Sequence, residues 1–209
     1  MKHRSLWIPL VLVLSIVPAA AFAEETAATE PLALGSAIPM ADARLKNIDG
    51  REIAVADLAG KKGTLVVFTC NACPWVKKWE NRIAAIGNAA QKRGIGVVAI
   101  NANDPGVNAG DSYEEMVKRA KKLGLKFPYA MDGTSAVAVA YGATRTPEAF
   151  LFDASGKLVY HGTVDDNAND ARSVKQAYLR QAVDAVVAGK AVPTAQTKSL
   201  GCAIKFRKA

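Results

Sequence analysis

The chain has 209 residues, of which 50% are hydrophobic and 22% are charged. This balance is typical of a globular protein and excludes a disordered chain, a collagen or a coiled coil. Lys and Arg outnumber Asp and Glu by 27 to 19, which gives a formal net charge of +8. No recognisable nucleic-acid-binding motif accompanies this charge, so no nucleic-acid partner is expected. The three cysteines are too few for a disulfide scaffold, and each needs its own explanation.

Residues 1–23 have the pattern of a secretory signal peptide. A positive segment at 2–4 precedes an apolar run at 6–17, and residues 21–23 (AFA) form an A-x-A cleavage sequence. The apolar run is too short to span a bilayer comfortably, and no stop-transfer segment follows it. We therefore expect a periplasmic or secreted protein with no stable membrane insertion after cleavage. Without the signal peptide the net charge falls to +6, because two basic residues are removed.

Composition divides the rest of the chain into three segments. Residues 24–37 are rich in Ala, Thr, Glu and Pro without periodicity, which indicates a flexible lead-in. Residues 38–190 carry alternating strand and helix patterns and are expected to form one folded domain. Residues 191–209 are expected to form a C-terminal tail.

The folded domain is predicted to be an α/β protein. Its expected elements in chain order are a hairpin of residues 43–47 and 52–55 around Asp49-Gly50, a strand at 64–68, a helix at 75–92, a strand at 96–100, a helix at 112–123, a pair of strands at 149–152 and 158–160, and a helix at 172–188. Continuous apolar, β-branched runs are typical of strands buried on both faces. The order of elements indicates a central mixed β-sheet flanked by helices, with an N-terminal β-hairpin.

A Cys-x-x-Cys sequence, Cys70-Asn71-Ala72-Cys73-Pro74, lies where a buried strand is expected to end and a helix to begin. Free N–H groups and the helix dipole stabilise negative charge there, so a thiol at this position has a lowered pKa. We expect Cys70 to be the attacking thiolate and Cys73 to be the resolving thiol. A zinc site would need two more ligands, and only Cys202 and His161 are available, both distant in sequence. A purely structural disulfide across so short a loop would add little stability, and no cofactor or metal is expected.

Three segments together resemble one protein family. They are residues 68–77 (FTCNACPWVK), 146–153 (TPEAFLFD) and 201–205 (GCAIK). They resemble the thioredoxin-like superfamily, and within it the redoxin (AhpC/TSA-like) proteins. The resemblance implies a thioredoxin-like fold over residues 38–190, with the cysteine pair facing a cis-proline at Pro147. It also implies that the backbone of Thr146 binds a substrate strand beside the cysteines.

Further site residues are predicted around this pair. Thioredoxins carry a buried acidic residue in the strand before the motif, and the strand at 64–68 has none, so Glu148 is the nearest substitute by family geometry. Arg145 is a candidate for stabilising a thiolate or a peroxide. Cys202 could resolve an oxidised Cys73, link two chains, or be buried as a small hydrophobic residue.

These features predict an exported thiol–disulfide oxidoreductase. Cys70 would attack a disulfide in a protein or small molecule, Cys73 would resolve the mixed disulfide, and an external thiol reductant or oxidant would restore the enzyme. One alternative is a peroxiredoxin-like, antioxidant thiol peroxidase acting through Cys73, although Cys70 stands where peroxiredoxins have Thr. A second alternative is a Sco-like copper chaperone that uses the cysteines and His161. Sco-like proteins have three residues between their two cysteines, however, whereas this chain has two.

Overall fold

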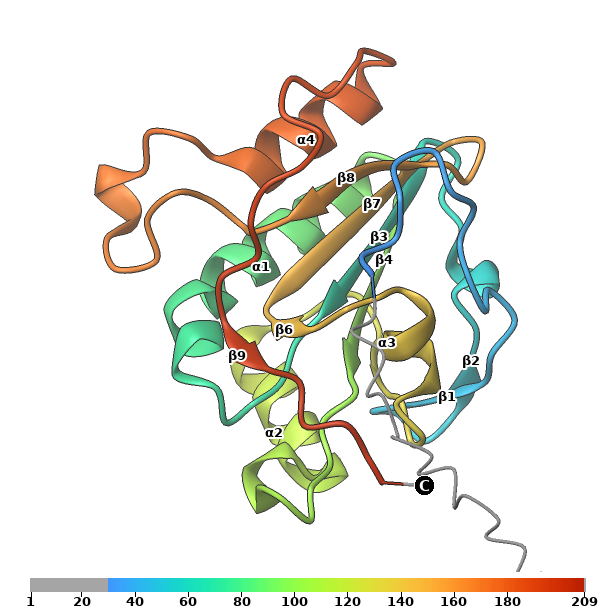
Figure 1. Cartoon of the computed structure of the whole chain (residues 1–209), viewed down its shortest axis with the longest axis vertical. Helices are drawn as coiled ribbons and strands as arrows, with labels where there is room; N and C mark the ends of the chain where they lie inside the picture. Colours follow the sequence, from blue (N-terminus) through green and yellow to red (C-terminus); the bar gives the residue numbers. More distant parts are fainter. Residues whose placement is uncertain (1–29, 209) are drawn as a thin grey trace, which may run out of the picture.

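The computed structural model describes residues 30–208, which fold around a seven-stranded sheet (Figure 1). The strands of this sheet are β1 (Leu45–Asn47), β2 (Glu52–Ile53), β3 (Gly63–Phe68), β4 (Ile95–Asn101), β5 (Tyr129–Met131), β7 (Glu148–Asp153) and β8 (Leu158–Gly162). Two short strands, β6 (Arg145–Thr146) and β9 (Cys202–Ala203), form a separate sheet. The α-helices are α1 (Pro74–Lys92), α2 (Tyr113–Leu123), α3 (Ala136–Ala140) and α4 (Tyr178–Val187), and short 3-10 helices cover Ala56–Leu58, Ala109–Asp111 and Ala171–Ser173.

The sheet is mixed, which confirms the predicted fold class. Its strand order is β2-β1-β5-β4-β3-β7-β8. The central strands β3, β4 and β5 run parallel, whereas β7 pairs antiparallel with β3 and β8 pairs antiparallel with β7. The predicted N-terminal hairpin is confirmed as β1 and β2, which form one edge. Because β3 and β4 run parallel, their C-terminal ends lie at the same end of the sheet. The loops that follow the two strands therefore lie next to each other.

The sheet separates two hydrophobic cores, because side chains of β3 alternate between its faces. Leu65 and Val67 pack with α1, α2 and α4 on one face. Val66 and Phe68 pack on the other face, where α3 lies (Figure 1). The expectation that this strand is buried on both faces is confirmed, and its end is therefore held rigidly at the site where Cys70 follows.

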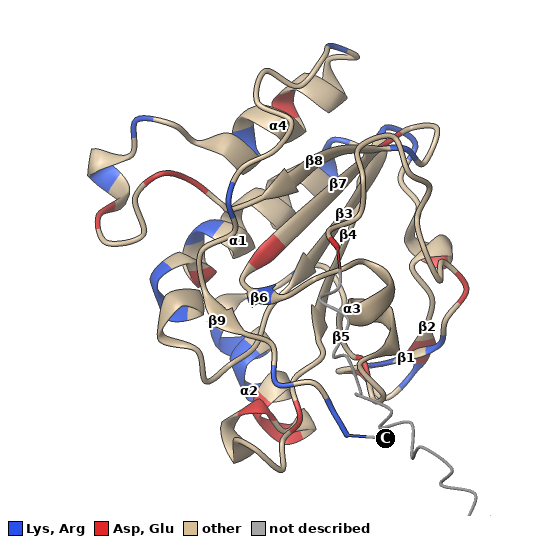
Figure 2. Ribbon diagram, in the orientation of Figure 1, with Lys and Arg blue, Asp and Glu red and all other residues tan. Residues whose placement is uncertain are grey.

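Helix α2 forms close to where the sequence predicts it. Ser112 caps its N-terminus by accepting a hydrogen bond from the Glu115 N–H at 3.4 Å. Gly124 ends it in the left-handed conformation, with φ at 62°. Acidic residues lie in its first turn and basic residues in its last (Figure 2), which complements the helix dipole.

The terminal helix was expected from residue 172, but α4 begins only at Tyr178. The preceding segment forms a polar loop in which Asp170 accepts a hydrogen bond from the Arg172 N–H. Asp166 accepts another from the Lys175 N–H at 3.0 Å. These side chains satisfy backbone donors in non-helical conformations, and they thereby compete with the helix.

The lead-in at 24–37 was expected to be flexible, but its described part packs on the domain. Leu32 N–H donates to Tyr141 O at 3.2 Å, and Gly35 N–H donates to Leu158 O at 2.8 Å. Leu32 also covers the hydrophobic core around α3, which explains why this segment is fixed. The predicted signal peptide lies outside the described residues. Within residues 30–208, no helix is both long and apolar enough to cross a membrane.

Gly96 lies near the start of β4, where the 3-10 helix after β2 crosses close to the sheet. A Cβ atom there would stand 1.7 Å from Leu58 O and 2.8 Å from Gly60 N. We predict that Gly96→Ala lowers the free energy of unfolding by about 2–4 kcal/mol, measured by urea denaturation. Gly133→Ala is the matched control, because nothing lies within 4 Å of its Cβ position. Equal stabilities of the two variants would contradict this account of the contact.

Candidate active site

The cysteine pair lies in the loop between β3 and α1. Cys73 is the N-cap residue of α1, and Pro74 is its first helical residue. Cys70 lies three residues before Cys73, just after the end of β3. Both side chains are buried, with 3% of Cys70 and 5% of Cys73 exposed.

Thr146 lies beside the sulfurs of the cysteine pair. The Thr146–Pro147 peptide is cis, so the expected conformation of this proline is confirmed. The Thr146 hydroxyl lies 3.3 Å from Cys70 Sγ, and Cys73 Sγ donates to Thr146 O at 3.4 Å. Thr146, the residue before the cis-proline, therefore contacts both thiols.

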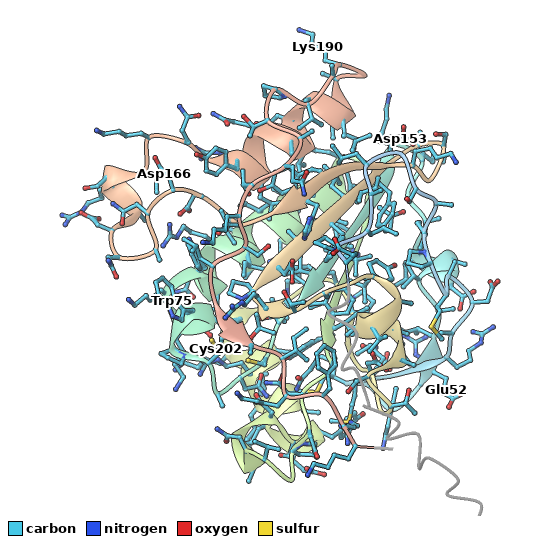
Figure 3. The ribbon with its side chains drawn as sticks, in the orientation of Figure 1. Glu52, Trp75, Asp153, Asp166, Lys190 and Cys202 are labelled. Carbon is cyan, nitrogen blue, oxygen red and sulfur yellow. The ribbon has the colours of Figure 1, made fainter. Side chains whose placement is uncertain are left out.

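The third cysteine, Cys202, joins the same cluster. It lies on β9, which pairs antiparallel with β6 so that Cys202 stands opposite Thr146. Its side chain is half-buried and packs against the cluster of Cys70, Cys73 and Val76. Figure 3 shows Cys202 beside the start of α1, which carries the labelled Trp75. All three cysteines, separated by up to 132 positions along the chain, therefore meet at one site.

The environment of Cys73 stabilises its thiolate. The Cys70 thiol has the largest effect, and together with the Cys202 thiol and nearby backbone N–H groups it outweighs burial and lowers the pKa of Cys73. Cys73 also occupies the N-cap position of α1, where the free N–H groups of the first turn favour negative charge. The site therefore favours a thiolate on Cys73.

The environment of Cys70 has the opposite effect. Its hydrogen bond to Cys73, its burial and the negative charge of Asp111 all raise the pKa of Cys70. The helix N-terminus was expected to lower the pKa of Cys70, whereas these three effects act in the opposite direction. Because α1 begins at Pro74, Cys73 and not Cys70 occupies the N-cap position.

Asp111 is a buried acid that contacts the loop between the two cysteines. Its Oδ1 accepts the N–H groups of Asn71 at 2.7 Å and Ala72 at 2.9 Å. Asn103 Nδ2 donates to its other oxygen at 2.9 Å. Asp111 is absent from the site residues that the sequence predicts. Its position after β4 was the available signal, because β3 and β4 are parallel and their following loops share an edge.

Glu148, predicted as a possible proton acceptor, has a different set of partners. Burial alone would raise its pKa, but hydrogen bonds from His161 and from the N–H groups of Arg145 and Thr144 lower it. His161 Nε2 lies 2.6 Å from one carboxylate oxygen, and Ser199 Oγ donates to the same oxygen at 2.9 Å. Glu148 therefore holds the loop before the cis-proline and the C-terminal tail together.

The remaining predicted residues lie at the edge of the site. Arg145 is exposed, and its guanidinium donates to Gly201 O at 3.3 Å, so it contacts the tail. His161 is buried, paired with Glu148 and stacked on Phe150. Among residues 30–208 no group of three potential ligands is arranged to hold a metal ion. The ligand set of the copper alternative is therefore not found in this part of the chain.

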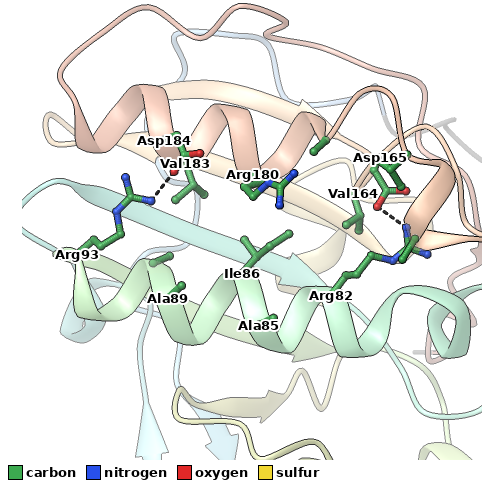
Figure 4. A pocket seen from close by; sticks show the side chains of 14 residues that line it. Arg82, Ala85, Ile86, Ala89, Arg93, Val164, Asp165, Arg180, Val183 and Asp184 are labelled. Atoms are coloured by element: carbon green, nitrogen blue, oxygen red, sulfur yellow. Dashed lines mark hydrogen bonds and ion pairs between the residues drawn. The ribbon is translucent and has the colours of Figure 1, made fainter.

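Of two hollows in the protein surface, one lies away from the cysteines and the other, a small one, is lined in part by Cys70. A cavity of about 350 Å³ lies between α1 and α4 and is lined by Arg82, Arg180 and Val183 among others (Figure 4). None of the cysteines lines it. A hollow of about 30 Å³ lies beside Cys70 and is lined by Tyr129 and other residues of that core. The site therefore lies where several chain segments come together, and it is not a deep pocket.

The fold and the site define a thioredoxin-like protein with three clustered thiols. Residues 33–178 match the Redoxin family, and the chain belongs to that family. It is 33% identical over 140 residues to the thiol-disulfide oxidoreductase ResA of Geobacillus thermodenitrificans, covering 66% of this chain and 71% of the relative. The ResA of Geobacillus kaustophilus is 29% identical over 161 residues, covering 74% of this chain and 83% of the relative.

Two solved structures of similar size share the fold. A hypothetical protein from Sinorhizobium meliloti superposes with a TM-score of 0.78 and 37% identity, covering 86% of this chain and 98% of the other. An uncharacterized conserved protein from Geobacillus kaustophilus gives a TM-score of 0.78 and 38% identity, covering 85% and 94% of the two chains. The resemblance to thioredoxin-like redoxin proteins is thus confirmed.

Replacing Asp111 with Asn tests its effect on the motif. The amide keeps the shape but removes the charge that opposes a Cys70 thiolate, so we predict a lower pKa of Cys70 and a loss of about 1–3 kcal/mol in stability. Alkylation rate against pH measures the pKa in a Cys73→Ser, Cys202→Ser background. Asp104→Asn, in the same loop, is the control. An unchanged or higher pKa of Cys70 would contradict the assigned role.

Replacing Glu148 with Gln tests its role in stability. Its folded pKa lies below the ordinary value of 4.5, so its contribution is complete above that value and is lost as pH falls through the folded pKa. We predict that Glu148→Gln destabilises the protein by about 1–3 kcal/mol at neutral pH and that the difference shrinks in acid. Urea denaturation across pH measures this, with the exposed Glu52→Gln as control. A difference independent of pH would exclude the ionised carboxylate as its source.

Proposed function

We propose that this protein is a thiol–disulfide oxidoreductase whose Cys70 and Cys73 cycle between dithiol and disulfide. The observation that carries this proposal is the contact of both sulfurs with Thr146 beside a cis peptide, with Cys73 capping α1. Membership in the Redoxin family and the similarity to proteins named thiol-disulfide oxidoreductase support the same enzyme class.

The environments of the two thiols assign their roles. The Cys73 thiolate attacks one sulfur of a substrate disulfide, and the other sulfur leaves as a thiolate. Cys70 then attacks Cys73 Sγ in the mixed disulfide and gives its proton to the second departing substrate sulfur. The products are a dithiol substrate and a Cys70–Cys73 disulfide, so two electrons pass from the enzyme to the substrate. These roles are the reverse of those expected from the sequence.

The oxidised pair has to be reduced before another cycle. An external thiol, from a protein or a small molecule, would attack the disulfide and restore the two thiols. The N-terminal pattern of residues 1–23 supports export, and an exported enzyme meets a compartment where substrate disulfides persist. We therefore propose that both the substrate and the reductant act outside the cytoplasm.

A thiol peroxidase acting through Cys73 is the second candidate. The lowered pKa of Cys73 favours it, since the thiolate is the form that reacts with a peroxide. Two further thiols lie beside Cys73 and could resolve the sulfenic acid that forms. The two functions differ in their need for Cys70, because peroxide reduction followed by Cys202 resolution does not use it.

Single-cysteine trapping tests the proposal. In a Cys202→Ala background, Cys70→Ala leaves Cys73 without a resolving partner, so we predict that a stable mixed disulfide with substrate accumulates. Cys73→Ala in the same background removes the thiolate, and we predict roughly 100-fold less adduct at mildly acidic pH. Intact-mass measurement under non-reducing conditions counts the adducts.

Three results would overturn parts of this proposal. Accumulation of the adduct only in Cys73→Ala would restore Cys70 as the attacking thiol. The absence of an adduct in both variants would reject thiol–disulfide exchange. Full peroxide consumption by Cys70→Ala with an intact Cys202, together with none by Cys73→Ala, would establish the peroxidase instead.

A further inference from the structure

The C-terminal strand β9 lies against the backbone that precedes the cis-proline. It pairs antiparallel with β6, with Cys202 opposite Thr146 and Ala203 opposite Arg145. Thr146 also contacts both sulfurs of the motif. The paired strand therefore brings Cys202 to these sulfurs, and its side chain packs against Cys70 and Cys73.

Close backbone contact fixes this arrangement. A Cβ atom on Gly201 would lie 2.1 Å from Thr146 O and 2.6 Å from its carbonyl carbon, so no side chain fits there. Immediately after β9, Ile204 is buried and its N–H donates to Thr144 O at 3.0 Å. Lys205 N–H then donates to Asn103 Oδ1 at 2.9 Å. The strand is therefore held on both sides of Cys202.

The packing of the side chains shows which disulfide the tail could form. Cys202 packs against the cluster of Cys70, Cys73 and Val76. It also stands opposite Thr146, whose carbonyl oxygen lies 3.4 Å from Cys73 Sγ. Cys73 acts on the pKa of Cys70 and of Cys202, so it neighbours a thiol from its own motif and one from the tail and is common to both possible disulfides.

We propose that Cys202 is a third redox-active thiol, which receives the disulfide of the catalytic pair and carries it to the surface. This inference rests on the proposed function, because the Cys70–Cys73 disulfide is its starting point. Cys202 Sγ attacks Cys73 Sγ, the Cys70–Cys73 bond breaks and a Cys73–Cys202 bond forms. Cys70 Sγ takes the electron pair and the proton that Cys202 gives up. No external oxidant or reductant is consumed in this step.

Exposure explains why such a transfer would help the enzyme. Cys70 and Cys73 are both buried, whereas Cys202 is half-buried at the edge of the domain. An external thiol therefore reaches Cys202 more easily than either sulfur of the original pair. Burial and the negative charge of Asp111 also favour the protonated form of Cys70 once the disulfide has moved. The reductant would attack Cys202 Sγ in the Cys73–Cys202 disulfide and would release the Cys73 thiolate.

Disulfide mapping of the full chain tests this relay. The reduced protein is oxidised with oxidised glutathione, quenched in acid and digested without reduction for mass spectrometry. We expect both Cys70–Cys73 and Cys73–Cys202 disulfides in the unchanged protein, and an intramolecular Cys73–Cys202 disulfide in Cys70→Ser. In Cys202→Ser we expect the Cys70–Cys73 disulfide to form, and its reduction by glutathione to be at least roughly 10-fold slower.

A second variant displaces the strand but keeps all three thiols. Gly201→Val places a side chain against Thr146 O, so we expect it to lose the Cys73–Cys202 disulfide while the Cys70–Cys73 disulfide still forms. Ala203→Val is the matched control, because Ala203 is exposed on the same strand and its variant should retain both disulfides. Circular dichroism establishes that each variant is folded.

The results separate failure of the relay from failure of the enzyme. If Cys202→Ser forms and reduces its Cys70–Cys73 disulfide at the unchanged rate, and no Cys73–Cys202 disulfide appears in the unchanged protein, the relay is rejected and the proposed function stands. Cys202–Cys202 dimers in place of the internal disulfide would also reject it. If Cys202→Ser forms no Cys70–Cys73 disulfide at all, the proposed function itself fails.

Discussion

The contacts of one sulfur organise this site. Cys73 Sγ lies at the start of α1, 3.4 Å from Thr146 O, and its side chain packs with those of Cys70, Val76 and Cys202. Each of these neighbours comes from a segment that has to be in place before the thiolate is stabilised. The positions of the loop after β3, the cis-proline loop and β9 therefore bear directly on the reactivity of a single atom.

Two buried carboxylates, those of Asp111 and Glu148, hold these segments in place through hydrogen bonds. Within residues 30–208, none of these hydrogen bonds is made with a cysteine sulfur. Asp111 accepts the N–H groups of Asn71 and Ala72, which fixes the loop between the cysteines. Glu148 accepts hydrogen bonds from the Thr144 N–H and the Ser199 hydroxyl, and it thereby joins the cis-proline loop to the C-terminal tail. The negative charge of Asp111 also raises the pKa of Cys70.

Much of the fold could be predicted from the sequence, because the signals are local. The apolar run at 64–68 and the helical pattern at 112–123 each specify their own element, and both are confirmed. The late start of α4 could not be predicted from periodicity, because side-chain hydrogen bonds of the preceding loop decide it. The packing of Leu32 depends on a surface that only the folded domain provides.

Most residues of the site were named from the sequence, but Asp111 and the directions of the pKa shifts of the thiols were not. Spacing identifies the cysteine pair, and the resemblance identifies the cis-proline, yet which cysteine caps α1 depends on where the helix begins. The contact of Cys202 with Cys73 depends on the pairing of two-residue strands that are distant in the chain, β6 and β9. Such short pairings leave no pattern in the sequence. The position of Asp111 after β4 was a signal, but its hydrogen bonds to Asn71 and Ala72 depend on the folded backbone.

The central claim is that the negative charge of the reduced site resides on Cys73. Nuclear magnetic resonance of the fully reduced protein, with cysteine labelled at Cβ, would follow the titration of each thiol separately. The account predicts that Cys73 titrates well below the usual range of a thiol, while the pKa values of Cys70 and Cys202 lie above it. A first titration at Cys70, with Cys73 protonated at neutral pH, would contradict it.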